Sequence, residues 1–463
     1  MNAHYKYSEP KERIEGKDLP VFSDPSRSRS RKVTVLAGAV LVFVVFWIVA
    51  LGLHILKVEG IEFDRSRFVT SDAAPLFAPD GISPDVDPMV ADNAYTNDLA
   101  KPTQTLLPSC DGMRGRDEAL LQGSRSIFAF LPVVPEWAYT SLEKNCAQID
   151  VLVPAWYEVS ETGAAVKDVA SDFHDAGRIR KLITKNRDNF ALMPSISLPG
   201  LDNFSKAIAL LGTEALRQGV VDELTRLAIA KDFDGICFDT TEFSLDTSGV
   251  ATKFMQQLKA AFAPANLKTC SIIDVENEFW LEADLIEASD RAVVTMVRQP
   301  FAGSSPAPVA PQQWFEETAD FVASVVPSEK LVFALGTGGF DWETGAAEPI
   351  WTDYTSILSQ VSLQDGHVRF FDADLNSQAI YIDEDQNRHF SWFVDAATFH
   401  NQLRTLERYG LAGVAVWTLG REDPGIWDVL ALQGAPFPAL QERLETVSVA
   451  DDLRYFGKGT FFQ

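Results

Sequence analysis

The stretch of sequence that decides the fold runs from Phe233 to Glu242 and reads FDGICFDTTE. A short apolar segment lies here between two aspartates, which is typical of a buried strand that carries polar groups at its end. Side chains alternate along a strand, so Cys237, Asp239 and Thr241 share one face. The stretch therefore predicts a buried strand whose last inward side chains are polar.

Seven further apolar runs of this kind surround it, at residues 127–133, 149–156, 190–197, 269–274, 292–297, 331–336 and 413–419. Helical patterns lie between several of them, at 213–232, 251–263, 311–326 and 399–410. Eight apolar strands with helical crossovers predict an α/β fold of the (β/α)8 TIM-barrel type, with chemistry at the carboxyl ends of the strands. A doubly wound open sheet is the alternative, although no G-x-G-x-x-G follows the first run.

The segment between the seventh and eighth runs has a different texture. Residues 367–395 read HVRFFDADLNSQAIYIDEDQNRHFSWFVD, in which polar and apolar residues alternate and polar turns intervene. Period-two alternation is typical of antiparallel strands with one solvated face. We therefore expect a small antiparallel insertion between strands 7 and 8 of the barrel.

One long apolar run, residues 33–56, contains no Asp, Glu, Lys or Arg. As a helix it would be about 36 Å long, which exceeds the hydrocarbon core of roughly 30 Å, so we expect a transmembrane signal anchor. The basic residues before it predict a cytoplasmic N-terminus and an extracytoplasmic barrel, periplasmic or at the cell surface; they are Arg27, Arg29, Arg31 and Lys32.

The remaining boundaries follow from composition. Residues 1–32 are polar and are expected to form a disordered cytoplasmic tail, and residues 58–122, rich in Pro, Asp and Ala, a linker or collar. The barrel is expected over residues 123–440, followed by a C-terminal extension at 441–463.

Charge and cysteine content narrow the choice of partners. The net charge of −25 argues against a nucleic-acid partner and suits a neutral or cationic one. Four cysteines allow three pairings, which the sequence does not resolve: Cys237 and Cys270 are expected on neighbouring strands and could pair, but two buried thiols are the default expectation. The histidine spacings match no metal motif, and the sequence predicts neither a metal nor a cofactor.

The fourth run resembles the D-x-x-D-x-D-x-E strand of chitinase-like glycoside hydrolases of family 18. The resemblance covers most of residues 124–432, because residues 295–322, 329–342 and 413–427 look like later motifs of that family in the same order. It is nearest to a membrane-anchored branch in which such a domain precedes a polysaccharide deacetylase module and a family 2 glycosyltransferase. The resemblance implies a TIM barrel that handles an N-acetylhexosamine polymer.

Residue roles follow from the same resemblance. The family's final Glu protonates the glycosidic oxygen, the substrate's acetamide attacks the sugar carbon, and the preceding Asp orients that acetamide. Here Thr241 stands at the Glu position, Asp239 and Asp234 are kept, and Cys237 replaces the second Asp. Loss of a general acid typically costs about 10² to 10⁴ in rate, so the resemblance implies a catalytically degenerate hydrolase, a pseudoenzyme.

Three further positions belong to the implied substrate site. Arg298 and Gln299 stand where the family has a Tyr and an Asp on the sixth strand, and Trp417 stands where a Trp floors the sugar site. An inward Asp239 without a partner would be costly, so Arg298 is predicted either to pair with it or to reach solvent at the barrel mouth. Other tryptophans, among them Trp156 and Trp342, are expected in the core.

Three functions remain open from the sequence. The first is a glycan-binding protein that handles an N-acetylhexosamine polysaccharide and has lost its acid. The second is an active hydrolase in which Glu242, one residue out of phase, is turned inward by a strand-end bulge. The third is a scaffold that docks onto a polysaccharide synthase or deacetylase without contacting sugar.

Overall fold

The computed structural model describes residues 125–132, 136–160, 162–163, 165–173, 176–198, 204–241, 247–277 and 283–432, with a few positions between 439 and 444. All of them lie in the second of the chain's two compact units, Asp92–Gln463. The predicted anchor at 33–56, the linker at 58–122 and Glu242 lie outside the described residues. Within the described part, no helix has both the length and the apolar character needed to cross a bilayer.

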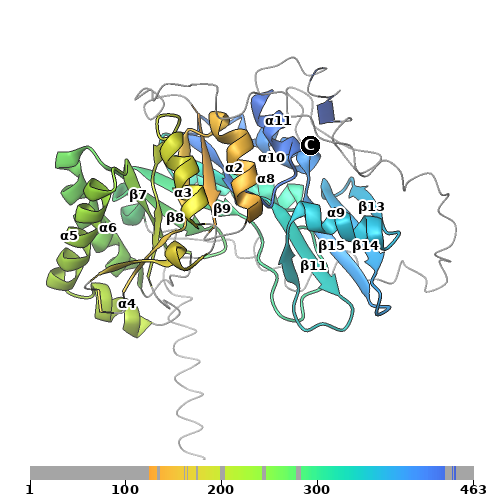
Figure 1. Cartoon of the computed structure of the whole chain (residues 1–463), viewed down its shortest axis with the longest axis horizontal. Coiled ribbons are helices and arrows are strands. Elements are labelled where there is room, and N and C mark those ends of the chain that lie inside the picture. Colours follow the sequence, from red (N-terminus) through yellow and green to blue (C-terminus); the bar gives the residue numbers. More distant parts are fainter. Residues whose placement is uncertain are drawn as a thin grey trace, which may run out of the picture. The chain divides into compact units, whose positions relative to one another are not determined.

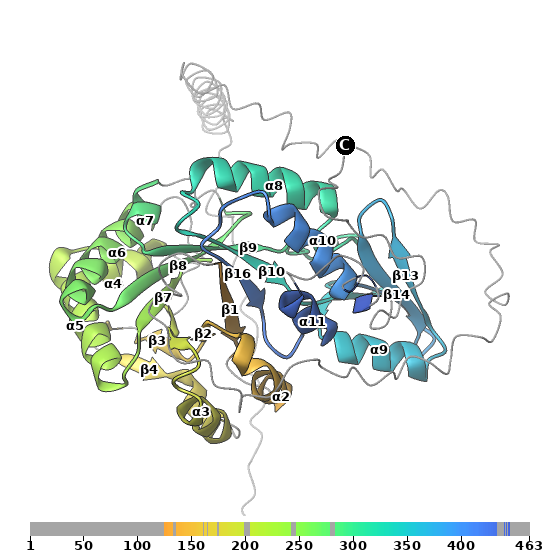
Figure 2. The same ribbon diagram turned by 90° about the horizontal axis from the view of Figure 1, so that it is seen from above.

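Eight parallel strands form a closed ring, which confirms the predicted α/β barrel (Figures 1 and 2). The third strand is split at Pro194: β5 pairs with β2, and β6 pairs with β7. The last strand, β16, pairs with both β10 and β1, so the ring has no free edge. The strands are β1 Ser126–Leu131, β2 Val151–Pro154, β5 Ala191–Leu192 with β6 Ser195–Ser197, β7 Gly235–Asp239, β8 Lys268–Asp274, β9 Arg291–Met296, β10 Leu331–Gly336 and β16 Gly413–Trp417.

Helices cover the outside of the ring (Figure 2). The four helical patterns of the sequence are all found, as α5 Glu214–Ala230, α6 Ser248–Phe262, α8 Gln312–Val325 and α10 Ala396–Leu406. The Thr213 side chain caps α5 and the Asp395 side chain caps α10, each accepting a backbone N–H of the first turn. The others are α2 Glu136–Asn145, α3 Ala176–Lys185, α4 Phe204–Leu211, α7 Ala283–Glu287 and α11 Gly425–Ala431. A short ribbon, β3 Tyr157–Val159 with β4 Val166–Asp168, extends the second strand.

The predicted antiparallel insertion is present between β10 and β16 and is larger than expected. Its five strands lie in the order β12-β11-β15-β14-β13, with α9 Tyr354–Leu363 packed beside β14 and β15. The insertion starts at Gly338, immediately after the seventh barrel strand, where φ is +70° and a Cβ would lie 2.5 Å from the Thr352 carbonyl oxygen. The strands are β11 Gly338–Glu343, β12 Ile350–Thr352, β13 His367–Phe371, β14 Asn376–Ile382 and β15 Arg388–Val394.

Strand alternation divides the core into two layers. One set of side chains fills the barrel interior, and the other packs against the surrounding helices. The interior set includes Phe128, Val151, Met193, Cys237, Cys270, Val293, Val332 and Ala415. Because the period of a strand is two, this set fixes which residues at the strand ends face the mouth of the barrel.

Candidate functional site

The barrel mouth is lined by the next inward residue on each strand after the interior layer. This rule selects one acid on β7 and one on β8, together with hydroxyl and aromatic groups on other strands. They include Ser195, Asp239, Asp274, Thr295, Gly336 and Trp417, and Phe130 of the interior layer packs against Trp417. The mouth is therefore polar on the side of β6 to β9 and aromatic on the side of β16 and β1.

Asp239 ends β7 and is held by Thr241. One carboxylate oxygen, Oδ1, accepts the Thr241 backbone N–H at 3.0 Å and the Thr241 hydroxyl at 2.7 Å. Burial raises the pKa of Asp239, the two Thr241 hydrogen bonds oppose the rise, and the nearby Asp274 carboxylate adds to it. The predicted site residues Asp239 and Thr241 thus lie together at the mouth.

Two further acids at the mouth were missed in the sequence. Burial raises the pKa of Asp274, whose Oδ1 accepts the Glu276 backbone N–H at 2.9 Å. Burial also raises the pKa of Glu276, with a smaller contribution from Asp274. Asp274 has the same parity as Cys270 and Ile272, so the alternation of the run at 269–274 could have revealed it.

Arg298 does not pair with Asp239, so the predicted pairing was wrong. Its Nε lies 3.9 Å from Glu276 Oε1, and its guanidinium lies 5.9 Å from the centre of the Trp314 ring. The backbone explains this, because Arg298 lies beyond the end of β9 and its N–H is bound to the Val309 carbonyl, outside the strand's alternation. The Arg298 side chain is 49% exposed, which agrees with the alternative prediction that it reaches solvent.

Gln299 contributes its backbone to this rim. Its N–H donates to Glu276 Oε2 at 3.2 Å, and no hydrogen bond of its side chain occurs among the described residues. Its predicted substrate contact therefore remains a prediction.

Asp234 lies at the opposite end of the barrel, so a role in substrate binding does not fit its position. It precedes β7, and its Oδ2 accepts the Leu192 backbone N–H at 2.7 Å and pairs with Arg187 at 2.7 Å. The motif position is occupied, but its carboxylate ties the third strand to the fourth at their amino ends.

Trp417 closes β16 at the mouth, where the resemblance places a sugar floor. Its ring lies 4.5 Å from the Phe130 ring, it is half-buried, and its peptide bond to Thr418 is cis. Trp156 and Trp342 are 5% and 8% exposed, which confirms that they are core residues. Trp417, at the end of β16, is therefore the most exposed of these three tryptophans and lies at the mouth.

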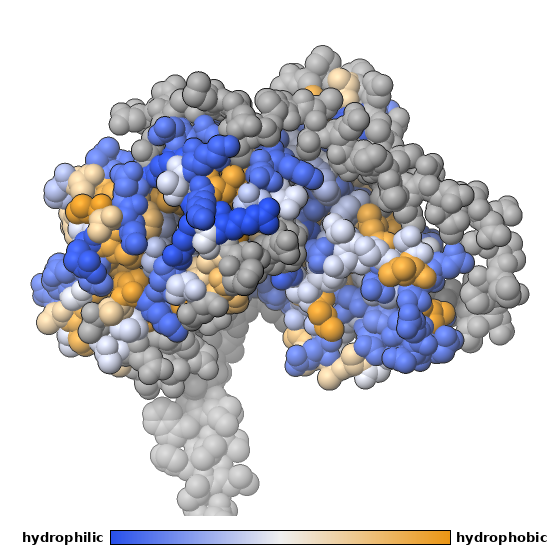
Figure 3. Space-filling view, in the orientation of Figure 1, coloured by the Kyte–Doolittle hydropathy of each residue, from blue (hydrophilic) through white to orange (hydrophobic). Residues whose placement is uncertain are grey.

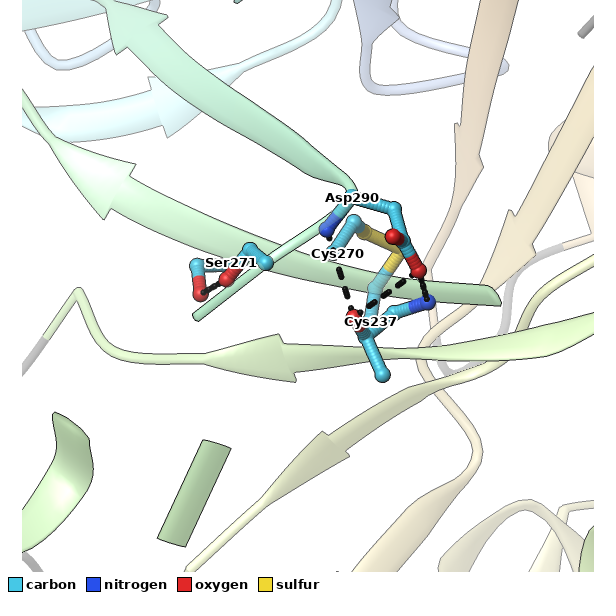
Figure 4. The surroundings of a disulfide bond; sticks show 6 residues. Cys237, Cys270, Ser271 and Asp290 are labelled. Carbon is cyan, nitrogen blue, oxygen red and sulfur yellow. Dashed lines mark hydrogen bonds between the residues drawn. A yellow bond between two sulfur atoms is a disulfide. The ribbon is translucent and has the colours of Figure 1, made fainter. Parts of the chain in front are cut away.

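A disulfide joins Cys237 to Cys270 directly below the acids, so the default expectation of two free thiols was wrong (Figure 4). The two residues are in-register neighbours on β7 and β8, and both point into the barrel, with their Cα atoms 4.4 Å apart. That separation lies within the range a disulfide requires. Cys146 is disulfide-bonded as well.

No cluster of His, Cys, Asp and Glu side chains suited to a metal ion occurs within the described ranges. The mouth is therefore described by its carboxylates, hydroxyls and indole.

Proteins of similar sequence include a glycosylase and a cortical fragment-lytic enzyme, both at low identity. No protein-family model matches the chain. The uncharacterized glycosylase YvbX of Bacillus subtilis is 20% identical over 235 residues, which is 48% of this chain and 68% of that protein. The cortical fragment-lytic enzyme of Bacillus subtilis is 22% identical over 239 residues, and the match spans 48% of this chain and about half of the enzyme, 55%.

Solved structures share the fold at low sequence identity. A chitinase from Chromobacterium violaceum superposes with a TM-score of 0.60 at 19% identity, covering 67% of this chain and 99% of that one. The spore cortex-lytic enzyme SleL of Bacillus megaterium gives a TM-score of 0.58 at 17% identity, covering 67% and 74%. A class V chitinase from Nicotiana tobaccum gives 0.55 at 12% identity, covering 67% and 98%. The described barrel shares the fold of these chitinases, which agrees with the fold that the sequence motifs predicted.

Proposed function

We propose that this chain is an exported, membrane-tethered glycan-binding protein that holds an N-acetylhexosamine polysaccharide at the barrel mouth without cleaving it. The observation that carries the proposal is the Asp239–Thr241 pair. The family's orienting carboxylate is present, and the position of its acid is occupied by a hydroxyl that donates to that carboxylate. The site therefore keeps groups for binding and lacks the group for protonation.

The chemistry of Thr241 supports this proposal. An aliphatic hydroxyl cannot deliver a proton to a leaving oxygen near neutral pH, whereas a carboxylic acid with a raised pKa can. The Thr241 hydrogen bonds both fall on Oδ1 of Asp239, and no described residue donates to Oδ2, which could accept a donor from a bound sugar.

The aromatic side of the mouth supports a glycan as ligand. The half-buried Trp417 offers a flat, amphipathic ring on the aromatic side of the mouth, and such rings suit the apolar face of a pyranose. A solved relative in fold, the Nicotiana chitinase, has also been determined in complex with NAG4. We extend this ligand class to the present chain as part of the proposal.

The tether follows from residues 33–56 and their basic flank. With the barrel outside the cytoplasm, the mouth would meet a polysaccharide near the outer face of the membrane. A polysaccharide synthase or deacetylase would be a natural partner at that place.

Isothermal calorimetry of the full chain in detergent with N-acetylglucosamine hexamer tests the binding, and release of a chromogenic aglycone from an N-acetylglucosamine oligomer tests cleavage. We expect binding that Asp239→Ala abolishes, and no release. Release that Glu242→Gln abolishes would establish a hydrolase in place of a binding protein. Absence of heat with every oligomer, together with co-purification of a membrane synthase, would favour the scaffold.

A further inference from the structure

We propose that the barrel mouth selects polymers that carry de-N-acetylated hexosamine units, and that the C2 ammonium of such a unit binds between Asp239 and Asp274. This inference rests on the proposed function, because it names the kind of sugar that the same mouth prefers. It gives Asp274 a role as a specificity residue that the family resemblance does not assign.

Negative charge is in excess at the barrel mouth. The Asp274 carboxylate lies close enough to Asp239 and to Glu276 to raise the pKa of each. Among the described residues, the ion pairs at the mouth include one cation, Arg298, and it pairs with Glu276. Asp239 and Asp274 are thus left facing the mouth without a positive partner in the described part of the chain.

Asp239 and Asp274 also have unused hydrogen-bond acceptor capacity. Asp239 receives both Thr241 hydrogen bonds on Oδ1, and Asp274 receives the Glu276 N–H on Oδ1. The Oδ2 atom of each carboxylate accepts no hydrogen bond from a described residue. An ammonium group has three donors and no acceptor, which matches two acidic oxygens and the flanking Thr295 hydroxyl.

A disulfide holds together β7 and β8, the strands that carry the two acids. Cys237 lies two residues before Asp239 and is bonded to Cys270, four residues before Asp274 (Figure 4). Their strands pair in register, with Asp239 opposite Ile272, so Asp274 lies one inward step further along the neighbouring strand. The crosslink resists the separation that repulsion between two carboxylates would favour.

A neutral sugar cannot compensate the negative charge of these two acids, whereas a cationic sugar can. Burial and repulsion from Asp274 raise the pKa of Asp239, and a cation between the acids would offset the repulsion. An acetamide offers one neutral N–H, whereas an ammonium offers charge-assisted bonds of roughly twice the strength. We therefore expect a glucosamine oligomer to bind about tenfold more tightly than its acetylated counterpart.

The test compares glucosamine hexamer with N-acetylglucosamine hexamer by calorimetry on the full chain at about pH 6.5, where a sugar amine is protonated much as an α-amino group is. In wild type we expect the glucosamine hexamer to bind about tenfold more tightly. In Asp274→Asn we expect that preference to fall to about twofold or less, with little change for the acetylated hexamer. The matched control is Asp188→Asn, which removes an exposed carboxylate at the amino end of the barrel.

The outcomes separate this inference from the proposed function. Equal binding of the two hexamers, or a preference that Asp274→Asn leaves intact, overturns the ammonium site while the glycan-binding function stands. Binding of neither hexamer overturns the proposed function itself. A preference that Asp188→Asn lowers as much as Asp274→Asn does, and that salt at about 0.5 M abolishes, would come from the overall charge of −25 and would overturn the local site.

Discussion

Thr241 donates two hydrogen bonds to one oxygen of Asp239, from its backbone N–H at 3.0 Å and from its hydroxyl at 2.7 Å. The hydroxyl bond exists because residue 241 is a threonine, at a position where the sequence resemblance predicts an acid. It stabilises the ionised form of a carboxylate whose pKa burial raises. These two hydrogen bonds couple Thr241 to Asp239.

The first prediction concerns that hydroxyl. Thr241→Val keeps the shape and the backbone N–H and removes one donor to the carboxylate. A hydrogen bond to a charged group contributes about 1.5–3 kcal/mol, so the pKa of Asp239 should rise further above its ordinary range. A carbon-13 NMR titration of the aspartate carboxyl groups measures this shift, and affinity for the acetylated hexamer at neutral pH should fall with it.

Thr225→Val is the matched control for this variant. The Thr225 hydroxyl donates at 2.7 Å to the Val221 carbonyl within α5, away from the mouth. The control should leave the Asp239 titration unchanged. An unshifted Asp239 pKa in Thr241→Val would show that the hydroxyl does not stabilise the carboxylate.

The second prediction concerns Arg298. Its pair with Glu276 spans 3.9 Å between side chains that are 49% and 40% exposed, so Arg298→Gln should change the free energy of unfolding by less than about 1 kcal/mol. Removing this cation makes the mouth more negative, and the preference for a glucosamine hexamer over its acetylated counterpart should increase. The two changes are measured by chemical denaturation and by calorimetry.

Asp274→Asn should lower the preference for the glucosamine hexamer, whereas Arg298→Gln should raise it. A fall in affinity for both hexamers in Arg298→Gln would instead mean that Arg298 contacts the sugar directly.

Strand periodicity made the fold and half of the site predictable. Once the run at 233–242 was taken as a buried strand, alternation alone put Cys237 and Asp239 inside the barrel, where the structure has them. The same rule applied to the run at 269–274 would have found Asp274. The rule fails for Arg298, because that residue lies past the strand end, where a hydrogen bond to the Val309 carbonyl sets its direction.

Other differences depended on information that alternation does not carry. Register between neighbouring strands, which brings Cys237 opposite Cys270, is set by the whole ring of pairings. The resemblance assigned Asp234 to the site as a motif position, whereas its place before the first residue of β7 puts it at the far end of the barrel.

The third prediction concerns the disulfide between Cys237 and Cys270. The crosslink joins residues 33 apart in the sequence, and the loop-entropy relation gives a stabilisation of about 3–4 kcal/mol for a loop of that size. Both residues are 0% exposed, so they should resist mild reductants in the folded protein. Denaturation with and without reductant during unfolding should show a loss of that order in the free energy of unfolding.

Cys237→Ala with Cys270→Ala separates this crosslink from the disulfide at Cys146. If the double variant loses no more than about 1 kcal/mol, the crosslink is not a main source of barrel stability.

Asp423 is a fully buried acid between α10 and α11. Its Oδ2 accepts the Ala396 N–H and its Oδ1 accepts the Gly425 N–H, each at 2.8 Å. Burial and the nearby Asp395 raise the pKa of Asp423 to about 7, and Asp428 adds a smaller repulsion. Asp428 is paired with Arg443 at 2.7 Å, while the Tyr354 hydroxyl faces Asp423 from α9.

This pKa predicts that the protein loses stability as the pH rises. The folded state holds a proton on Asp423 that the unfolded state, with an ordinary aspartate pKa, releases near pH 4. The stabilising contribution is therefore complete below about pH 4 and is lost as the pH passes through about 7. The free energy of unfolding, measured by denaturant titration, should fall between pH 5 and pH 8. Asp423→Asn removes the titrating group and its repulsion on Asp395, so the free energy of unfolding of this variant should fall clearly less over that pH range. Asp188→Asn should retain the wild-type slope. Equal slopes in wild type and Asp423→Asn would mean that Asp423 is ionised in the folded protein across this range.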